Sequence, residues 1–265
     1  MDDYLKKLEH CVSHITLWMD QNFLKLNKDK TEYILLNQKG TFTCEQTSLK
    51  LGNCVIKPTD TVRNLGVVFD KHMTMETHVN ATCKAAYYNL YRISKIRKYL
   101  SEKSTKTLVH ALVISKLDYA NSLLYGVSSN VLRKLQRVQN MAARLVTKTK
   151  KREHITPALM RLHWLPVKER IFYKVLLTVY KCLHGCAPEY LQDIVTLHVP
   201  KRSLRSGTQR LLVKPQSKLK VGDRRFAVSG PELWNNLPLE LRLISSISAF
   251  KSQLKTHLFK KAYYL

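Results

Sequence analysis

Acidic residues and glycines are scarce in this 265-residue sequence. It contains 19 Asp and Glu residues against 45 Lys and Arg residues, and only eight glycines. It has no Gly-x-Ser-x-Gly motif and no glycine-rich phosphate-binding loop. Its one acidic pair, Asp2-Asp3, precedes a predicted helix, whereas two-metal phosphoryl transfer needs carboxylates brought together at strand ends. These absences argue against a serine-esterase nucleophile, a P-loop and a self-sufficient two-metal centre.

Long hydrophobic runs are also missing. The longest, such as Val175-Leu176-Leu177, are far shorter than the roughly 18 apolar residues of a membrane-spanning helix. The first seven residues are acidic and then basic, with no apolar run behind them. The six cysteines are scattered over a long chain, which favours buried free thiols in a reducing compartment. We therefore expect an intracellular protein, nuclear or cytoplasmic and not secreted.

Positive charge is the feature present in excess. The net charge is +26, of which residues 1–130 carry +6 and residues 131–265 carry +20. The hydrophobic content of 45% is that of an ordinary globular protein, so the chain is not wholly disordered. A folded surface with this excess repels itself unless a polyanion is near. Nucleic acid is the leading partner class. An anionic membrane is the alternative, but the basic helices lack the bulky apolar face that membrane binding needs.

The N-terminal part, residues 1–71, is predicted to combine one helix with a small sheet. Apolar residues recur at steps of three and four over 4–23, which indicates an amphipathic helix. Short strands are predicted at 33–36 and 62–69, and a hairpin around Gly52-Asn53 at 49–56.

Residues 72–151 are predicted to form a bundle of three helices. The first runs over about 25 residues from Thr74, the second begins at Ser101, and the third begins near Ser129, with Ser128 or Ser129 as its N-cap. Residues 152–198 are predicted to be a helical connector with a helix from Val167 to His184.

Residues 199–265 form a basic C-terminal region. Short strands are predicted there at 210–213 and 225–228, and helices at 231–235 and 248–263. The predicted fold is therefore mainly α, with a small N-terminal α/β remnant, a helical bundle and a basic α+β C-terminal tail.

Basic residues on the bundle helices are the candidate site. Such faces neutralise phosphates without reading bases, whereas the alternative is a solvated helix surface, which normally mixes both signs of charge. The candidates from the first two bundle helices surround one inter-helix turn: Arg92, Lys95, Arg97, Lys98, Lys103 and Lys106. Those of the third helix and its extension are Arg133, Arg137, Arg144, Lys148, Lys150, Lys151 and Arg152. Two more, Arg202 and Arg205, lie in a predicted basic loop.

Two other groups of residues each allow two interpretations. Trp164 and Trp234 could stack on bases, but a turn-helix context beside Leu and Pro favours a place in the core. Cys182, His184 and Cys186 are dense enough to suggest zinc. Their spacing of one intervening residue does not match a structural zinc site, which favours cysteines as small core residues, and we predict no metal site.

Several long motifs, in family order over nearly the whole chain, resemble the reverse transcriptases of LINE-class, non-LTR, jockey-like retrotransposons. The N-terminal motifs resemble the segment after the catalytic strands and the strand pair that grips the primer: Trp18 with NFLKLNKDKTEYILL, and NLGVVFD at 64–70. The next resemble the thumb and the region after it: SKLDYANSLLYG at 115–126, LRKLQRVQNMAARLV at 132–146, ITPALMRLHWLPVKERI at 155–171 and APEYLQDIV at 187–195. The last resemble the C-terminal tail: RSLRSG at 202–207, GPELWNNLP at 230–238 and AFKSQLKTHLF at 249–259.

The family's catalytic carboxylates have no counterpart in this sequence. The resemblance implies an aromatic-Ala-Asp-Asp turn and an earlier Asp, both ahead of the Trp18 helix, and Asp2-Asp3 lacks that context. It also implies that a complete polymerase would require magnesium, and that Lys30 could protonate a pyrophosphate leaving group there. The alternative for Asn27 and Lys30 is that they hold a turn. We expect no catalytic residue and no cofactor in this chain alone.

Three functional hypotheses remain open from the sequence. The first is a polymerase fragment, comprising the end of the palm, a thumb-like bundle and a tail, that binds RNA or an RNA/DNA hybrid without sequence preference. The second is part of a longer or split active reverse transcriptase. The third is the product of a decayed element without a selected function. Self-association through the incomplete N-terminal sheet is also expected.

Overall fold

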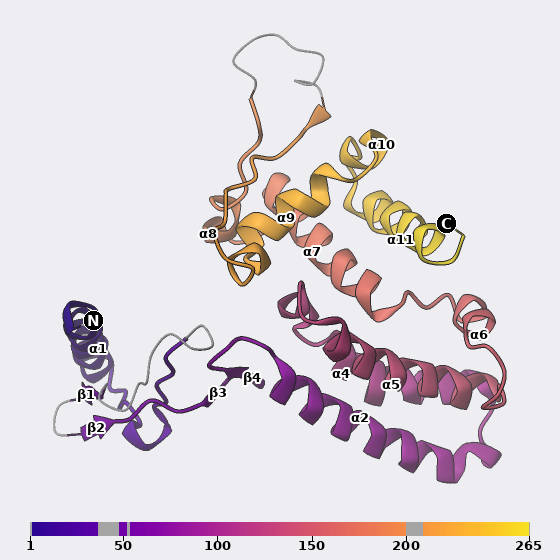
Figure 1. Cartoon of the computed structure of the whole chain (residues 1–265), viewed down its shortest axis with the longest axis horizontal. Helices are drawn as coiled ribbons and strands as arrows, with labels where there is room; N and C mark the ends of the chain where they lie inside the picture. The colour runs from indigo at the N-terminus through magenta and orange to yellow at the C-terminus, as the bar shows by residue number, and fades with distance from the viewer. Residues whose placement is uncertain (1, 37–47, 52–53, 200–208, 265) are drawn as a thin grey trace. The chain divides into compact units, whose positions relative to one another are not determined.

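The computed structural model describes residues 2–36, 48–51, 54–199 and 209–264. The chain divides into two compact units, residues 1–78 and 79–265. Across the described residues the protein is mainly α-helical, and its two antiparallel sheets have two short strands each and lie in the first unit, as predicted (Figure 1). In the described part of the chain, no helix combines the length and the apolar character needed to cross a membrane.

The first unit pairs one long helix with two β-hairpins. Helix α1 contacts β1, and a small core forms around Tyr33 and Leu49. The predicted hairpin at 49–56 is confirmed, with Leu49 opposite Ile56. The predicted strand at 33–36 is wrong, since only Tyr33 pairs, in an isolated bridge to Pro58. The elements are α1 (Asp2–Gln21), the 3₁₀ turn η1 (Lys28–Lys30), β1 (Leu49–Leu51), β2 (Cys54–Ile56), β3 (Thr61–Asn64) and β4 (Val67–Asp70).

The predicted single strand at 62–69 is a second hairpin. Leu65 and Gly66 have φ values of 46° and 80°, so both residues of the two-residue turn are left-handed. Two positive φ angles suit the twist of flanking antiparallel strands, and Asn64 accordingly faces Val67 across the turn. A turn was not predicted here because leucine rarely adopts a left-handed conformation, so Leu65 was expected to continue the strand. Gly66 adopts this conformation readily.

The remaining elements are helical. Helices α3, η3 and α4 follow one another directly, and the middle one, η3, is a π-helical turn. These elements are α2 (Glu76–Ile96), η2 (Arg97–Tyr99), α3 (Glu102–Val109), η3 (His110–Ile114), α4 (Ser115–Asp118), η4 (Asn121–Leu124), α5 (Ser129–Thr147), α6 (Thr156–Arg161), α7 (Val167–Leu183), α8 (Glu189–Gln192), η6 (Gly222–Arg224), α9 (Phe226–Asn235), α10 (Leu239–Arg242) and α11 (Ile247–Tyr263).

Side-chain caps begin two of the bundle helices where the sequence predicts. The Ser101 hydroxyl accepts a hydrogen bond from the Ser104 backbone N–H at 3.0 Å, and the Ser128 hydroxyl accepts one from the Val131 N–H at 3.4 Å. Each cap satisfies a backbone donor that the first helical turn leaves unpaired. The predicted start of the second helix at Ser101 and of the third near Ser129 is therefore confirmed.

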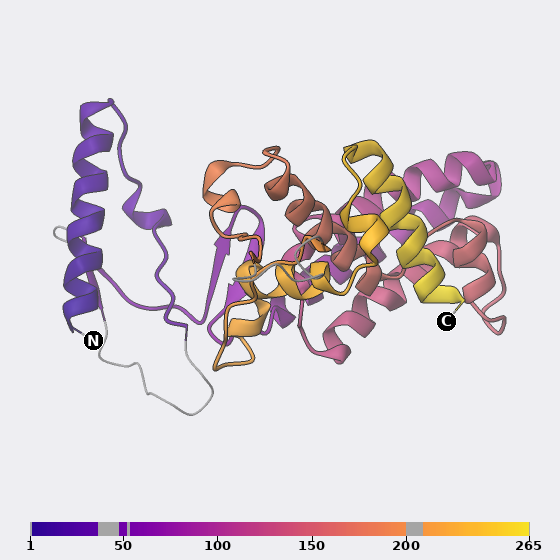
Figure 2. The same cartoon turned by 90° about the horizontal axis from the view of Figure 1, so that it is seen from above.

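Helix α7 organises the core of the second unit. It contacts α5 on one side and α9 and α11 on the other, and α11, drawn in yellow, lies beside it (Figures 1 and 2). Trp234 and Phe250 are fully buried against α7, with their ring centroids 6.0 Å apart. A Cβ at Gly230 of α9 would come within 2.9 Å of Val179 Cγ2, so glycine permits this close helix packing.

The strand predicted at 225–228 is wrong, because Phe226 begins α9. The apolar residues there belong to a helix face rather than a strand. In the described part of the C-terminal region, β structure is limited to one bridge between Leu197 and Leu212. The predicted C-terminal helix is confirmed as α11, with Phe250, Leu254 and Leu258 buried.

Candidate nucleic-acid interface

Helix α2 presents aromatic and basic side chains together on one exposed face. Its apolar residues, such as Ala86, Leu90 and Ile93, are buried at the spacing that the sequence predicts. The opposite face carries Tyr88 and Tyr91, with 62% and 59% of their surface exposed. With η2 this face forms what we call the tyrosine–cation stripe, made of Tyr88, Tyr91, Arg92, Lys95, Lys98 and Tyr99.

Each ring of the tyrosine–cation stripe has a cation over it. Arg92 Cζ lies 5.8 Å from the Tyr88 ring centroid, and Lys95 Nζ lies 4.9 Å from that of Tyr91. Lys98 Nζ lies 4.7 Å from the centroid of Tyr99, which is 76% exposed. Such contacts at exposed sites contribute about 0.5–1 kcal/mol each, so they orient the side chains without burying them. The stripe thus combines π faces with positive charge, as base stacking and phosphate contact require.

Arg97, beside the stripe, hydrogen-bonds to backbone carbonyls. Its Nε and Nη2 donate to the carbonyl oxygens of Leu145 and Val146 at 2.8 and 2.9 Å, and Nη1 donates to that of Leu100 at 2.8 Å. These bonds satisfy two carbonyls in the last turn of α5 and join the end of α2 to the end of α5.

Arg144 plays a similar part at the end of α5. Its guanidinium donates to the carbonyl oxygens of Lys150 and Glu153, the latter at 2.8 Å, and so holds the turn that follows the helix. Lys148 ends α5 with a left-handed φ of 57°. Four basic side chains of this turn remain exposed: Lys148, Lys150, Lys151 and Arg152.

The other predicted residues of the second unit are less closely grouped. On α5, Arg133 and Arg137 are exposed, and Arg133 Nη2 donates to Asn130 Oδ1 at 2.8 Å. On α3, Lys103 is exposed and Lys106 is half-buried. The Arg97 bonds bring the tyrosine–cation stripe and the basic turn after α5 to the same end of the bundle.

Asn27 and Lys30 belong to the first unit. Asn27 Oδ1 accepts a hydrogen bond from the Lys30 backbone N–H at 3.2 Å, and the Asn27 carbonyl accepts one from the Thr31 hydroxyl at 2.9 Å. Asn27 therefore holds the turn of η1, as the alternative interpretation expects. Arg202 and Arg205 lie outside the described residues.

Both tryptophans considered for base stacking are in the core. Trp164 and Trp234 are 2% and 0% exposed, and their indole N–H groups donate to His110 Nε2 at 3.1 Å and to the Arg210 carbonyl at 2.9 Å. Sequence reasoning missed the exposed tyrosines instead. The signal was present, since Tyr88 and Tyr91 each precede a basic residue by four positions, one helical turn.

The described residues do not fit a metal site. Among them, no three His, Cys, Asp or Glu side chains are grouped to hold an ion. Cys182 is buried and Cys186 exposed, while His184 stacks on Tyr180 with centroids 3.9 Å apart. At the N-terminus, Asp3 forms an exposed ion pair with Lys7 at 2.8 Å.

One comparison with known proteins gives a relative. Over 146 residues the chain is 25% identical to a Drosophila melanogaster protein described as "Probable RNA-directed DNA polymerase from transposon BS". The match covers 53% of this chain and 16% of the Drosophila protein. No family model and no solved structure matches. The similarity supports a relationship to transposon reverse transcriptases.

Proposed function

We propose that this chain is part of a LINE-class, jockey-like reverse transcriptase and binds RNA or an RNA/DNA hybrid without sequence preference. In this proposal residues 1–71 are the end of the palm, 72–151 a thumb-like bundle, 152–198 a connector and 199–265 a basic tail. The similarity to the Drosophila transposon protein supports the family, and the motif order supports the subclass and region. The binding proposal rests on one observation, the tyrosine–cation stripe of α2 and η2.

The stripe binds nucleic acid through two contributions. Arg92, Lys95 and Lys98 neutralise phosphates, which releases condensed counterions and depends steeply on salt. Tyr88, Tyr91 and Tyr99 offer ring faces on which unpaired bases stack, irrespective of sequence. The exposed basic turn after α5 extends the positive surface at the same end of the bundle. Arg97 and Arg144 position these elements through their backbone hydrogen bonds.

A tyrosine substitution tests the stacking contribution. The double variant Tyr88→Leu/Tyr91→Leu keeps every charge and removes two ring faces. Stacking contributes about 1–3 kcal/mol per base, so affinity for a single-stranded RNA should fall about tenfold or more in fluorescence anisotropy. The control is Tyr190→Leu/Tyr264→Leu, which removes two rings of similar exposure outside the stripe. Equal affinities for the two variants would remove the stripe from the proposal.

Polymerisation is proposed only for a longer or split enzyme. The described residues lack the grouped carboxylates that hold two magnesium ions. The matched segment is 16% of the length of the Drosophila protein. This small share favours the proposal that the chain works as part of a longer or split polymerase. Primer-extension assays of the purified chain with template, nucleotides and magnesium should show no product above a heat-inactivated control.

A further inference from the structure

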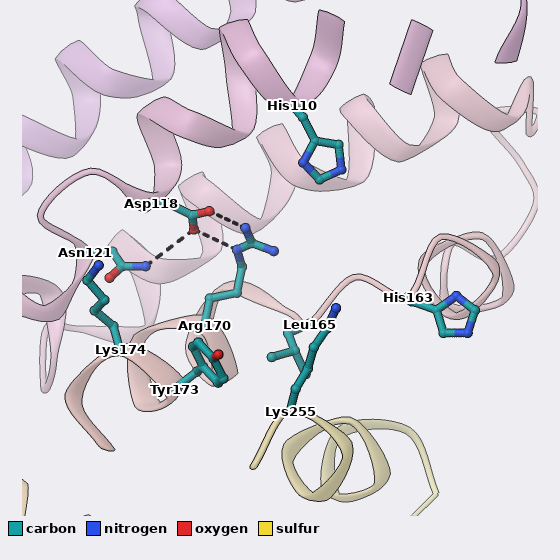
Figure 3. Close-up of a pocket in the computed structure, with 9 residues that line it drawn as sticks. All are labelled: His110, Asp118, Asn121, His163, Leu165, Arg170, Tyr173, Lys174 and Lys255. Carbon is teal, nitrogen blue, oxygen red and sulfur yellow. Dashed lines mark hydrogen bonds and ion pairs between the residues drawn. The ribbon is translucent and has the colours of Figure 1, made fainter. Parts of the chain in front are cut away.

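A cavity of about 350 Å³ lies in the second unit, and its lining residues are different from those of the tyrosine–cation stripe (Figure 3). Its walls come from η3, α4 and η4, from the His163–Leu165 turn, and from α7 and α11. Polar and charged groups from these elements converge on it: Asp118, Asn121, Arg170, Tyr173, Lys174 and Lys255. The volume is within the range of small-molecule sites and accommodates a single nucleotide.

One ion pair in the cavity is already complete. Arg170 donates to both carboxylate oxygens of Asp118, through Nε to Oδ1 at 2.8 Å and through Nη2 to Oδ2. The arginine side chain is 18% exposed and the aspartate side chain 39% exposed. This bidentate pair is rigid and neutral overall, so it shapes the wall without attracting a charged ligand.

Asn121 supplies a buried acceptor without a donor. The residue is 4% exposed, and its Nδ2 is 3.4 Å from Asp118 Oδ1, which fixes the amide orientation. Its carbonyl oxygen Oδ1 is turned away from Asp118 and has no hydrogen-bond partner among the described residues (Figure 3). A buried acceptor left unpaired costs about 1–3 kcal/mol, which a ligand N–H would recover.

The backbone around the cavity is also unusual. Ala120, next to Asn121, and His163 have left-handed φ values of 50° and 55°. His110 begins the π-helical turn, and such turns and strained residues occur often at functional sites. Burial and the nearby Arg170 and Lys106 charges lower the pKa of His110, which keeps the ring neutral as it accepts from Trp164. The fold thus maintains several unfavourable conformations around the cavity.

Two lysines give the cavity its net charge. Lys174 and Lys255 are exposed, and their ammonium groups have no hydrogen-bonded or ion-paired partner within the described part of the chain. Beside them lie the half-buried Tyr173 ring and the buried Leu165 side chain. The ligand that fits has an anionic group, an N–H donor and a flat apolar surface.

We propose that this cavity binds a nucleoside monophosphate unit. Lys174 and Lys255 contact the phosphate, Asn121 Oδ1 accepts an N–H from the base edge, and Tyr173 and Leu165 lie against the base. The same chemistry is available from a free nucleotide or from the 5′-phosphorylated end of a strand. This site is separate from the stripe, so it does not depend on the proposed function.

Calorimetry on the full chain at fixed ionic strength tests the proposal with AMP, ribose 5-phosphate and adenosine. We expect AMP to bind about tenfold more tightly than either fragment, since each lacks one of the two recognised groups. Equal affinity for AMP and ribose 5-phosphate would reduce the cavity to a general anion site and overturn the proposal, as would no binding of AMP.

Two variants assign the contacts. Asn121→Leu should bring AMP to the affinity of ribose 5-phosphate without lowering the melting temperature, because it removes an unpaired acceptor. Lys174→Gln/Lys255→Gln should weaken AMP and ribose 5-phosphate alike, and it carries the test if Asn121→Leu does not fold. Unchanged AMP affinity in the lysine variant contradicts the proposal. Lys218→Gln/Lys220→Gln removes two charges at exposed positions outside the cavity lining; it is the matched control and should leave AMP binding unchanged.

A third binding experiment distinguishes a free nucleotide from the 5′-phosphorylated end of a strand. A short 5′-phosphorylated oligoadenylate that competes with AMP and binds more tightly identifies a strand end, whereas weaker binding identifies the free nucleotide.

Discussion

Asp70 organises the start of α2 through four hydrogen bonds. Its Oδ1 accepts from the backbone N–H groups of His72 and Thr74 at 3.2 and 2.9 Å. Its Oδ2 accepts from the Thr74 hydroxyl at 3.0 Å and from the Met75 N–H at 2.6 Å. Met73 and Met75 have positive φ, so this carboxylate holds a strained segment between β4 and α2.

Asp70→Asn should therefore destabilise the protein. The amide cannot accept all four bonds, and a buried unpaired donor costs about 1–3 kcal/mol in the free energy of unfolding. Asp60→Asn removes an exposed ion pair to Lys71 and should cost less than about 1 kcal/mol. Urea denaturation at neutral pH measures both. Equal stability of the two variants would show that the Asp70 network contributes little.

The Asp70 network also predicts acid sensitivity. Burial alone would raise the pKa of Asp70, but hydrogen bonds from Thr74, Met75 and His72 hold it below its ordinary value of 3.8. The unfolded chain therefore binds this proton at a higher pH than the folded chain, and the stabilisation is lost as the pH falls through the folded pKa. The stabilities of the wild type and Asp70→Asn should converge as the pH is lowered below 3.8.

Three histidines that are partly removed from water act at a higher pH. Burial lowers the pKa values of His78, His110 and His257 below their ordinary value of 6.5. Because the unfolded chain protonates these rings first, the free energy of unfolding should fall as the pH drops through 6.5 and level off below the folded pKa values. Denaturation at pH values on both sides of 6.5 should show His110→Gln losing less stability than the wild type; an identical loss would exclude His110 as a contributor.

At the scale of elements, Arg97 and Arg92 illustrate two uses of the same side chain. Arg97→Gln removes donors from the carbonyls of Leu145 and Val146 and should destabilise the bundle by about 1–3 kcal/mol in thermal unfolding. Arg92→Gln, on the exposed face, should stay within about 0.5 kcal/mol of the wild type. A larger loss in Arg92→Gln than in Arg97→Gln would contradict the assignment of these roles.

The sequence predicted elements with regular periodicity and identifiable caps. The helices beginning at Ser101 and near Ser129, and the buried tryptophans, follow from such local patterns. Local patterns did not reveal the turn at Leu65, because that leucine has a left-handed conformation that leucine rarely adopts. They also did not reveal the start of α9 at Phe226. Nor could they show that Arg97 contacts the end of α5, because that contact joins residues about fifty positions apart.

The cavity depends still more on tertiary structure. Asp118 and Arg170 come from separate helices, and Lys255 comes from the C-terminal helix. Each of these residues stands in a different motif of the sequence, and the motifs are far apart along the chain, so only the packed fold brings the three side chains together. The sequence also does not distinguish an exposed arginine such as Arg92 from a backbone-bound one such as Arg97.

At the scale of the whole molecule, the first unit carries an apolar surface. On α1, Leu8, Ile15 and Trp18 are 40%, 47% and 58% exposed, and the hairpin sheets have two strands each. We expect self-association through this unit, which sedimentation would detect as concentration-dependent mass. Leu8→Gln/Ile15→Gln should reduce it. A concentration-independent monomer would contradict this prediction, as would slow hydrogen exchange throughout 48–70 in a verified monomer.

The central claim is that the stripe cations bind phosphates, and the salt dependence of binding to an RNA/DNA hybrid tests it most directly. Affinity should fall linearly on a log–log plot against salt, and Arg92→Gln/Lys95→Gln/Lys98→Gln should flatten the slope by about two to three units. The control, Lys218→Gln/Lys220→Gln/Lys251→Gln, makes the same charge change at exposed positions elsewhere and should keep the wild-type slope. A flat response in the wild type, or equal slopes for the two variants, would contradict the account.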